Sequence, residues 1–135
     1  MATIEDAIYA RLQSVSAVTS LVSTRIYPIK KDEGTKVVWP FVTYATTYAS
    51  PVVAMGDDPG MMSSEVRFHI WAQGSGAFDS AIAIKQAIRT ALQRWRGTAG
   101  GITVNASFLE GDFDIEDAEP GVFHRILDFD FRWYE

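Results

Sequence analysis

Hydrophobic and polar positions along the chain repeat with two different periods, and each period predicts a different element. Between Ile4 and Leu12 the apolar residues recur at intervals of three and four, which is the spacing along one face of an α-helix. Thr3 immediately precedes this stretch, and Asp6 lies three positions after Thr3. This spacing suits a capping box. The pattern predicts an opening helix of about three turns, followed by a further helical turn around Val18–Val22.

Several later segments show the strand period of two. Glu65–Gln73 alternates cleanly, and residues 41–49 are rich in β-branched and aromatic residues, both of which are typical of β-strands. Arg25–Pro28 is expected to be extended, and further strands are predicted at residues 102–109 and 122–134. In the alternation, Val66, Phe68, Ile70 and Ala72 point one way, and Arg67, His69 and Trp71 point the other. In the last strand the shared apolar face consists of Phe123, Leu127, Phe129, Phe131 and Trp133.

The helical period returns between Phe78 and Trp95, and Gly97 is placed to end that helix. Lys30–Lys36 and Ala54–Ser63 are predicted to be exposed loops, and the acidic residues 112–121 a solvated loop. The order is helix, strands, long helix, strands, without strict βαβα alternation. We therefore expect an α+β fold with a mostly antiparallel sheet and two main helices packed on one face.

Composition narrows the class of protein. The 135 residues suit a single domain, residues 1–135, and the absence of cysteine excludes disulfides, thiolate zinc sites and a cysteine nucleophile. A net charge of −5 argues against a surface that grips nucleic-acid phosphates. We expect no export signal and no membrane span, because no apolar run is long enough for either. These features predict a protein of the cytoplasm.

The candidate chemistry is sparse. His69 and His124 are the two imidazoles, and each falls inside a predicted strand, so a metal pair would require those strands to be adjacent. The acidic clusters do not follow the calcium-loop spacing, and Gly74–Ser80 lacks the lysine of a phosphate loop. We therefore expect no catalytic residue, no metal and no cofactor. A small hydrolase that uses His69, His124 and the acidic segments is kept as an alternative.

What remains is a surface suited to binding proteins, because aromatic residues and arginine are enriched at buried interface positions and methionine adapts to irregular contacts. The candidate interface residues are Arg25, Tyr27, Trp39, Tyr44, Met55, Asp57, Asp58, Met61, Met62, Arg67, His69, Trp71, His124 and Arg125.

Taken in order, these landmarks resemble the tail-completion or tail-terminator proteins of long-tailed phages and prophages. The matching segments are Glu5–Leu12, Val18–Val22, Arg25–Pro28, Pro40–Tyr44, Val66–Trp71, the helix with Ile88 and Leu92, and His124–Phe129. The resemblance implies a structural virion protein that forms a homo-oligomeric ring, hexameric in the family, on the head-proximal end of the tail tube. There it stops tube polymerisation and offers a joining surface to the head connector.

The same resemblance implies three partners: further copies of the chain, the tail tube protein and a head connector or completion protein. DNA would pass through the lumen of the ring without sequence-specific binding. The expected locations are the host cytoplasm during assembly and the tail or neck of the mature particle. We expect the Ala54–Ser63 and Lys30–Lys36 loops to reach toward neighbours. Another head-completion or connector protein of the neck is the main alternative.

Overall fold

A computed structural model of the protein describes residues 3–23, 25–28, 40–51, 60–115 and 122–134. Within these residues the chain forms three helices and six strands. In chain order they are α1 (Ile4–Ser14), α2 (Ser16–Val22), β1 (Ile26–Pro28), β2 (Phe41–Pro51), β3 (Met62–Gln73), α3 (Ala77–Leu92), β4 (Gly97–Ala99), β5 (Ile102–Ile115) and β6 (Val122–Tyr134).

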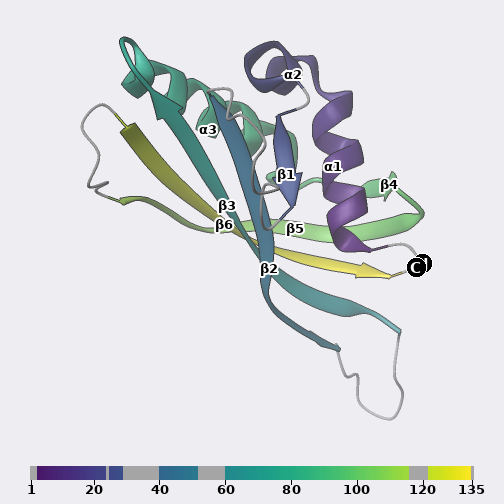
Figure 1. The fold of residues 1–135 in the computed structure, drawn as a ribbon. Helices are drawn as coiled ribbons and strands as arrows, with labels where there is room; N and C mark the ends of the chain where they lie inside the picture. The colour runs from purple at the N-terminus through teal and green to yellow at the C-terminus, as the bar shows by residue number, and fades with distance from the viewer. Residues whose placement is uncertain (1–2, 24, 29–39, 52–59, 116–121, 135) are drawn as a thin grey trace.

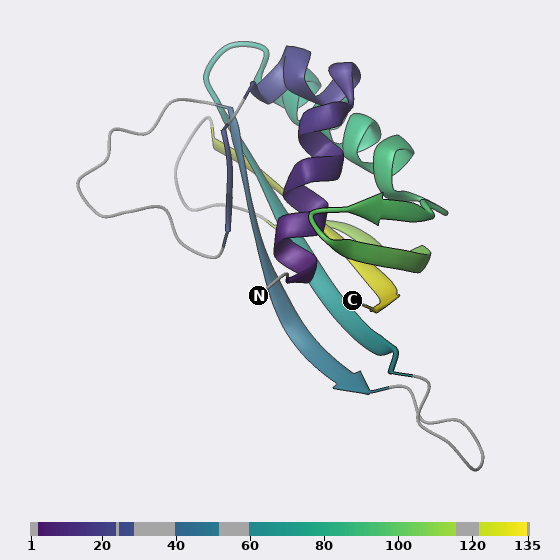
Figure 2. The same ribbon diagram turned by 90° about the vertical axis from the view of Figure 1, so that its right-hand side faces the viewer.

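The six strands form one sheet in the order β1-β2-β3-β6-β5-β4. β1 pairs with β2 in parallel, while the other neighbours pair antiparallel. Figures 1 and 2 show that the sheet curls and that the helices lie on its concave side. The opposite, outer face of the sheet is therefore left uncovered by the helices.

The predicted fold class is wrong in its sheet and in its helices. The sheet is mixed, because Ile26–Pro28 pairs in parallel with Val42–Tyr44, and α2 is a third helix separate from α1. Strand residues also outnumber helical ones in the described chain. A three-residue strand is too short to show a period, and its direction depends on a partner distant in sequence, so periodicity could not reveal it.

Two further segments differ from expectation. Gly97–Ala99, expected to be a connection, pairs antiparallel with Ile102–Val104 as β4. The strand predicted at residues 102–109 continues through Asp112 and Asp114 to Ile115, where a solvated acidic loop was expected. Pairing with β6 along this length satisfies the backbone groups of the acidic residues, which overrides their low strand propensity.

The opening helix forms as predicted. The Thr3 hydroxyl accepts a hydrogen bond from the Asp6 backbone N–H, and the Asp6 carboxylate accepts one from the Thr3 N–H, each at 3.3 Å. This capping box satisfies donors that the first turn leaves without helical partners. α3 ends at Leu92, earlier than the predicted Trp95.

The core lies between the helices and the concave face of the sheet. Phe68 on β3 packs edge-on against Phe129 on β6, with ring centroids 5.8 Å apart, and both are fully buried. Leu12 of α1 and Ile88 of α3 belong to the same buried cluster. The predicted alternation of β3 is confirmed, because Val66, Phe68, Ile70 and Ala72 are all buried on this side.

The last residues of β2 and the first residues of β3 run side by side beyond the end of α1 (Figures 1 and 2). We call this part of the hairpin, residues 48–51 of β2 and 62–65 of β3, the arm. Tyr48 on the arm is 60% exposed. A bulge between Thr46 and Tyr48 precedes it, and bulges change the local twist and direction of a strand.

Candidate interaction surface

Two histidines that are 55 positions apart in sequence meet on the outer face of the sheet. His69 on β3 and His124 on β6 lie on adjacent antiparallel strands, and His69 Nδ1 is 2.7 Å from His124 Nε2. A hydrogen bond between two imidazoles requires one nitrogen to offer a lone pair. At most one of the two rings is therefore protonated on both nitrogens while this bond exists.

The histidine pair is part of a row of rings that crosses several strands. Trp71 stacks on His124 with centroids 3.7 Å apart, and its indole N–H donates to the Thr43 hydroxyl at 3.4 Å. Phe41 stacks on Trp71 at 6.1 Å, and Tyr27 lies 6.3 Å from Phe41. Offset and tilted ring pairs at these distances are favourable.

Beyond the histidines the row continues to β5. Ile126, next to His124 on the same face of β6, is fully buried although none of the described helices covers that face. Its partner across the strand pair is Phe113, which is 41% exposed. We call the whole set the outer band; its members are Tyr27, Phe41, His69, Trp71, His124, Ile126 and Phe113.

An ion pair borders the band. The Arg67 guanidinium donates to both carboxylate oxygens of Asp128, at 2.9 and 3.1 Å, and it also lies over the Phe113 ring at 5.5 Å. The bond to Asp128 raises the pKa of Arg67 above its usual value. Burial, and then the Arg67 charge, lower the pKa of His69 below 6.5. Burial and the Arg67 charge therefore both favour the neutral form of His69, which lies beside the fixed positive charge of Arg67.

Acidic side chains gather on the same face next to the ion pair. Burial raises the pKa of Glu110 above its usual 4.5, and the nearby charges of Asp130, Glu65 and Asp128 raise it further. Asp130 accepts a hydrogen bond from the Ser63 hydroxyl at 2.9 Å. The prediction that Asp128 and Asp130 mark the outer face of the last strand is confirmed by their register opposite Arg67 and Glu65.

The arrangement suits recognition of another protein. In the described part of the chain, no group of three or more histidine and carboxylate side chains is placed to hold a metal ion. A row of rings bordered by a bidentate arginine combines the side-chain types that dominate binding energy at protein interfaces. Its polar neighbours resemble the rim of such a surface.

The structure brings five predicted interface residues to this surface: Tyr27, Arg67, His69, Trp71 and His124. Met61 and Met62 lie apart from them, at the start of the arm, and both are half-buried.

Three predicted residues have other positions. Tyr44 is a core residue, not a surface residue: it is 2% exposed, and its hydroxyl donates to the Glu5 carbonyl at 3.1 Å. Arg125 faces the helix side, where it is buried, pairs with Asp114 at 2.6 Å and lies over Phe78 at 5.1 Å. Arg25 donates to the carbonyl of Pro40 at 2.9 Å, so it joins β1 to the start of β2.

The predicted residues Trp39, Met55, Asp57 and Asp58 lie outside the described residues, as does the Lys30–Lys36 loop. Phe41, Ile126 and Phe113 also belong to the outer surface, although the sequence pattern did not predict them there. Phe113 alternates with Asp112 and Asp114, which is the period of a β-strand, but the acidic residues around it led to the prediction of a loop. Ile126 continues the outward positions of His124 and Asp128, so strict alternation would have placed it on that face.

Comparison with known proteins gives the class and then the family. The fold, a curled mixed sheet with helices on one side, is similar to that of a chain from the virion of a native gene transfer agent (GTA) particle. The two are 14% identical with a TM-score of 0.79, over 96% of this chain and 92% of that one. A second solved chain without a descriptive name is 12% identical, with a TM-score of 0.57 over 98% and 95% of the two chains. At these identities the likeness concerns the fold alone.

Residues 6–134 match the family described as Tail completion protein gp17, and the chain belongs to this family. The resemblance to phage tail-completion proteins is thereby confirmed. No curated protein matches the sequence. Among the described residues, no helix is long and apolar enough to cross a membrane.

Proposed function

We propose that this protein is a non-catalytic tail-completion subunit that assembles with copies of itself into a ring, six in number as the resemblance implies. The ring caps the head-proximal end of the tail tube, stops its polymerisation and offers a joining surface to the head connector. The observation that carries the proposal is membership of the tail-completion family over residues 6–134. The fold likeness to a chain of a gene transfer agent virion supports it.

The outer band provides a surface for these contacts. It lies on the sheet face that the helices leave uncovered, where the Arg67 guanidinium pairs with Asp128 and lies over the Phe113 ring, and where Trp71 stacks on His124. Phe113 is 41% exposed, and Tyr27, His69 and Trp71 are half-buried, so these side chains lose contact with water when a second protein covers them, which is a favourable source of binding energy. The net charge of −5 fits a lumen through which DNA slides without being held.

Electron microscopy of particles made without this protein tests the role. Tails of excess length are expected, because nothing would stop the tube from growing. Normal tails detached from heads would instead identify a head-joining protein of the neck. Fully infectious particles would contradict both roles.

A matched pair of variants tests the surface. Phe113→Ser is expected to reduce tail completion in a complementation assay by about tenfold or more, since central aromatic contacts often contribute about 2 kcal/mol or more. Tyr9→Ser on α1 is the control, because Tyr9 is 37% exposed and Phe113 41% exposed. Equal effects of the two changes would argue against the outer band as the contact surface.

A further inference from the structure

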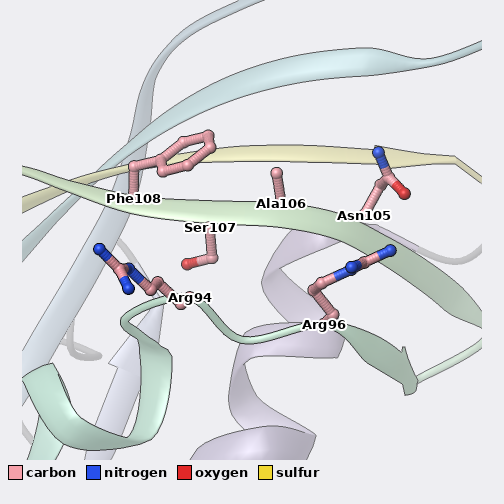
Figure 3. Close-up of a pocket in the computed structure, with 6 residues that line it drawn as sticks. All are labelled: Arg94, Arg96, Asn105, Ala106, Ser107 and Phe108. Carbon is pink, nitrogen blue, oxygen red and sulfur yellow. The ribbon is translucent and has the colours of Figure 1, made fainter.

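A cavity of about 420 Å³ opens where the segment after α3 runs beside β5. Figure 3 shows Arg94 and Arg96 on that segment and Asn105 and Phe108 on the strand, with Ser107 between them. The lining residues are Arg94, Arg96, Asn105, Ala106, Ser107 and Phe108. We call this cavity the basic pocket.

The backbone holds Arg94 in a conformation that disfavours an arginine. The Trp95 N–H donates to the Leu92 carbonyl at 3.1 Å, Gln93 has φ −64° and ψ 122°, and Arg94 has φ 57°. These values describe a type II turn with Arg94 at the position that glycine prefers. An arginine in this conformation points to a function for its side chain.

The guanidinium groups of the pocket have no ion-pair partner in the described part of the chain. Arg67, Lys85 and Arg125 each pair with an aspartate, whereas Arg94 and Arg96 are exposed and form no such pair. Phe108 beside them is 45% exposed. Guanidinium groups bond carboxylates and stack on aromatic rings, so the pocket suits a partner that offers both.

Two further arginines add positive charge at the same end of α3. Arg89 lies in the last turn of the helix, where it is exposed and, within the described residues, forms no ion pair. Arg11 Nε donates to the Ala91 carbonyl at 3.1 Å, and its guanidinium lies over the Trp95 ring at 5.5 Å. Positive charge therefore gathers at the end of α3 in a chain whose net charge is −5.

The start of α3 has the opposite character. Phe78 and Phe123, which are 48% and 37% exposed, meet edge-on with ring centroids 5.6 Å apart. Asp79 is exposed and has no ion-pair partner among the described side chains. Asp114 pairs with Arg125, but the Asp114 side chain is 57% exposed and that of Arg125 only 10%. The exposed charge here is therefore negative. We call Phe78, Asp79, Asp114 and Phe123 the acidic patch.

The acidic patch and the basic pocket lie at opposite ends of α3. Phe78 is in the first turn of the helix, whereas the Leu92 carbonyl at its last residue accepts a hydrogen bond from the Ser107 hydroxyl of the pocket at 2.6 Å. At about 1.5 Å per residue, Phe78 and Leu92 are about 21 Å apart along the helix axis. One copy therefore cannot bring its own acidic patch into its own basic pocket, but two copies can meet in this way.

The two surfaces match in both charge and shape of side chain. The pocket offers two guanidinium groups and the Phe108 ring, and the patch offers two carboxylates and two exposed rings. Complementary charges favour such a contact, and burial of the rings contributes to its stability. Nucleic-acid phosphates would also attract the arginines, but the net charge of −5 repels them. A second copy of the chain is therefore the better match.

We propose that the basic pocket binds the acidic patch of a second copy of this chain, with Asp79 and Asp114 facing Arg94 and Arg96 and with Phe78 packing beside Phe108. The inference rests on the proposed function, since it describes a contact between neighbours in the ring. The contact joins two different surfaces of one chain, and such head-to-tail contacts close into a ring when repeated by rotation.

Cross-linking between single-cysteine variants of the full chain tests the contact, because the natural chain has no cysteine. Ser80→Cys beside the acidic patch and Asn105→Cys in the pocket are prepared separately, mixed and treated with a short bis-maleimide. An 80–105 heterodimer is expected. The control replaces Ser80→Cys with Ala49→Cys, an exposed residue on the arm. Equal yields from the two mixtures, or no 80–105 product, would overturn the proposal.

Charge exchange tests the chemistry. Arg96→Glu in the pocket copy is expected to lower the 80–105 yield about tenfold, because reversal of an interfacial charge disfavours association. Asp79→Lys in the other copy should do the same, and mixing the two reversed copies should restore the yield. Glu65→Lys, which reverses an exposed charge on the arm, is the control and should leave the yield unchanged. An equal loss from Glu65→Lys, or no restoration, would contradict the pairing.

A variant that preserves the turn excludes loss of folding as the explanation. Glycine suits the backbone of the type II turn at position 94, so Arg94→Gly with Arg96→Ala should keep the Tm while it lowers the 80–105 yield. A normal yield from this variant would count against the pocket. Weaker binding of the same variant to a short DNA duplex, together with an unchanged 80–105 yield, would assign the pocket to nucleic acid and overturn the proposal.

The contact and the terminator role can fail separately. Overlong tails in the null mutant without an 80–105 product contradict only the contact between patch and pocket. Normal tails in the null mutant together with that product contradict only the terminator role.

Discussion

His69 Nδ1 and His124 Nε2 lie 2.7 Å apart across neighbouring strands, and the ring of Trp71 stacks on His124 at 3.7 Å. The bond joins the central strands β3 and β6 on the face that the helices leave open. Because it requires a neutral nitrogen, its strength depends on pH near the titration range of imidazole.

The lowered pKa of His69 predicts that stability falls in acid. Burial and Arg67 favour the neutral ring in the folded protein, so the unfolded chain binds more protons between the lowered pKa and 6.5. This contribution is complete above pH 6.5 and is lost as the pH falls through the folded-state pKa. Urea denaturation between pH 8 and about pH 5 should show the decrease, and His69→Gln should make it smaller. An unchanged pH dependence in that variant would exclude His69 as its source.

Tyr44 predicts a loss of stability in alkali. Burial, and then the charges of Glu5 and Asp6, raise the pKa of Tyr44 from 10.0 to about 12. The folded state therefore favours the neutral phenol, and its contribution is complete below pH 10 and is lost as the pH rises toward 12. Denaturation above pH 10 should show this decline in the natural protein and a weaker one in Tyr44→Phe. Tyr48→Phe on the exposed arm is the control and should behave like the natural protein.

Loss of the partner of the buried Arg125 is expected to destabilise the fold, and removal of the arginine charge is expected to restore the stability. Its guanidinium pairs with Asp114 at 2.6 Å and, within the described residues, its Nε has no hydrogen-bond partner. Asp114→Ala should lower the free energy of unfolding by roughly 1–3 kcal/mol, since it leaves a buried charge without its counter-ion. Adding Arg125→Met, which removes that charge and keeps most of the volume, should recover much of the loss. No recovery in the double variant would show that the charge is not the cause.

A side chain at Gly100 is expected to clash with α1, and the same substitution at Gly76 is the control. A Cβ at Gly100 would lie 3.0 Å from backbone atoms of Asp6 and Ala7, whereas a Cβ at Gly76 would meet nothing within 4 Å; both glycines have positive φ. Each alanine substitution should cost about 1 kcal/mol for the backbone conformation. Gly100→Ala should cost about 1–3 kcal/mol more, because α1 must shift. Thermal denaturation compares the two, and equal losses would mean that the contact with α1 relaxes freely.

The sequence by itself determined the elements whose cause is local. The Thr3–Asp6 capping box, the apolar stripe of α1 and the strict alternation of β3 each depend on residues a few positions apart, and all three appear in the structure. The same alternation placed Arg67, His69 and Trp71 on one face before any partner was known. The family resemblance also came from the order of such local landmarks, and the match over residues 6–134 confirms it.

Only the tertiary structure decided which of these elements meet. The parallel pairing of β1, the 2.7 Å bond from His69 to His124 and the burial of Tyr44 under α1 all join residues distant in sequence. Strand periodicity tells which face a side chain occupies, but it contains no information on strand order or register. The cavity lined by Arg94, Ser107 and Phe108 has the same origin, since it forms only where the segment after α3 packs against β5 through the bond from the Arg94 N–H to the Ser107 carbonyl.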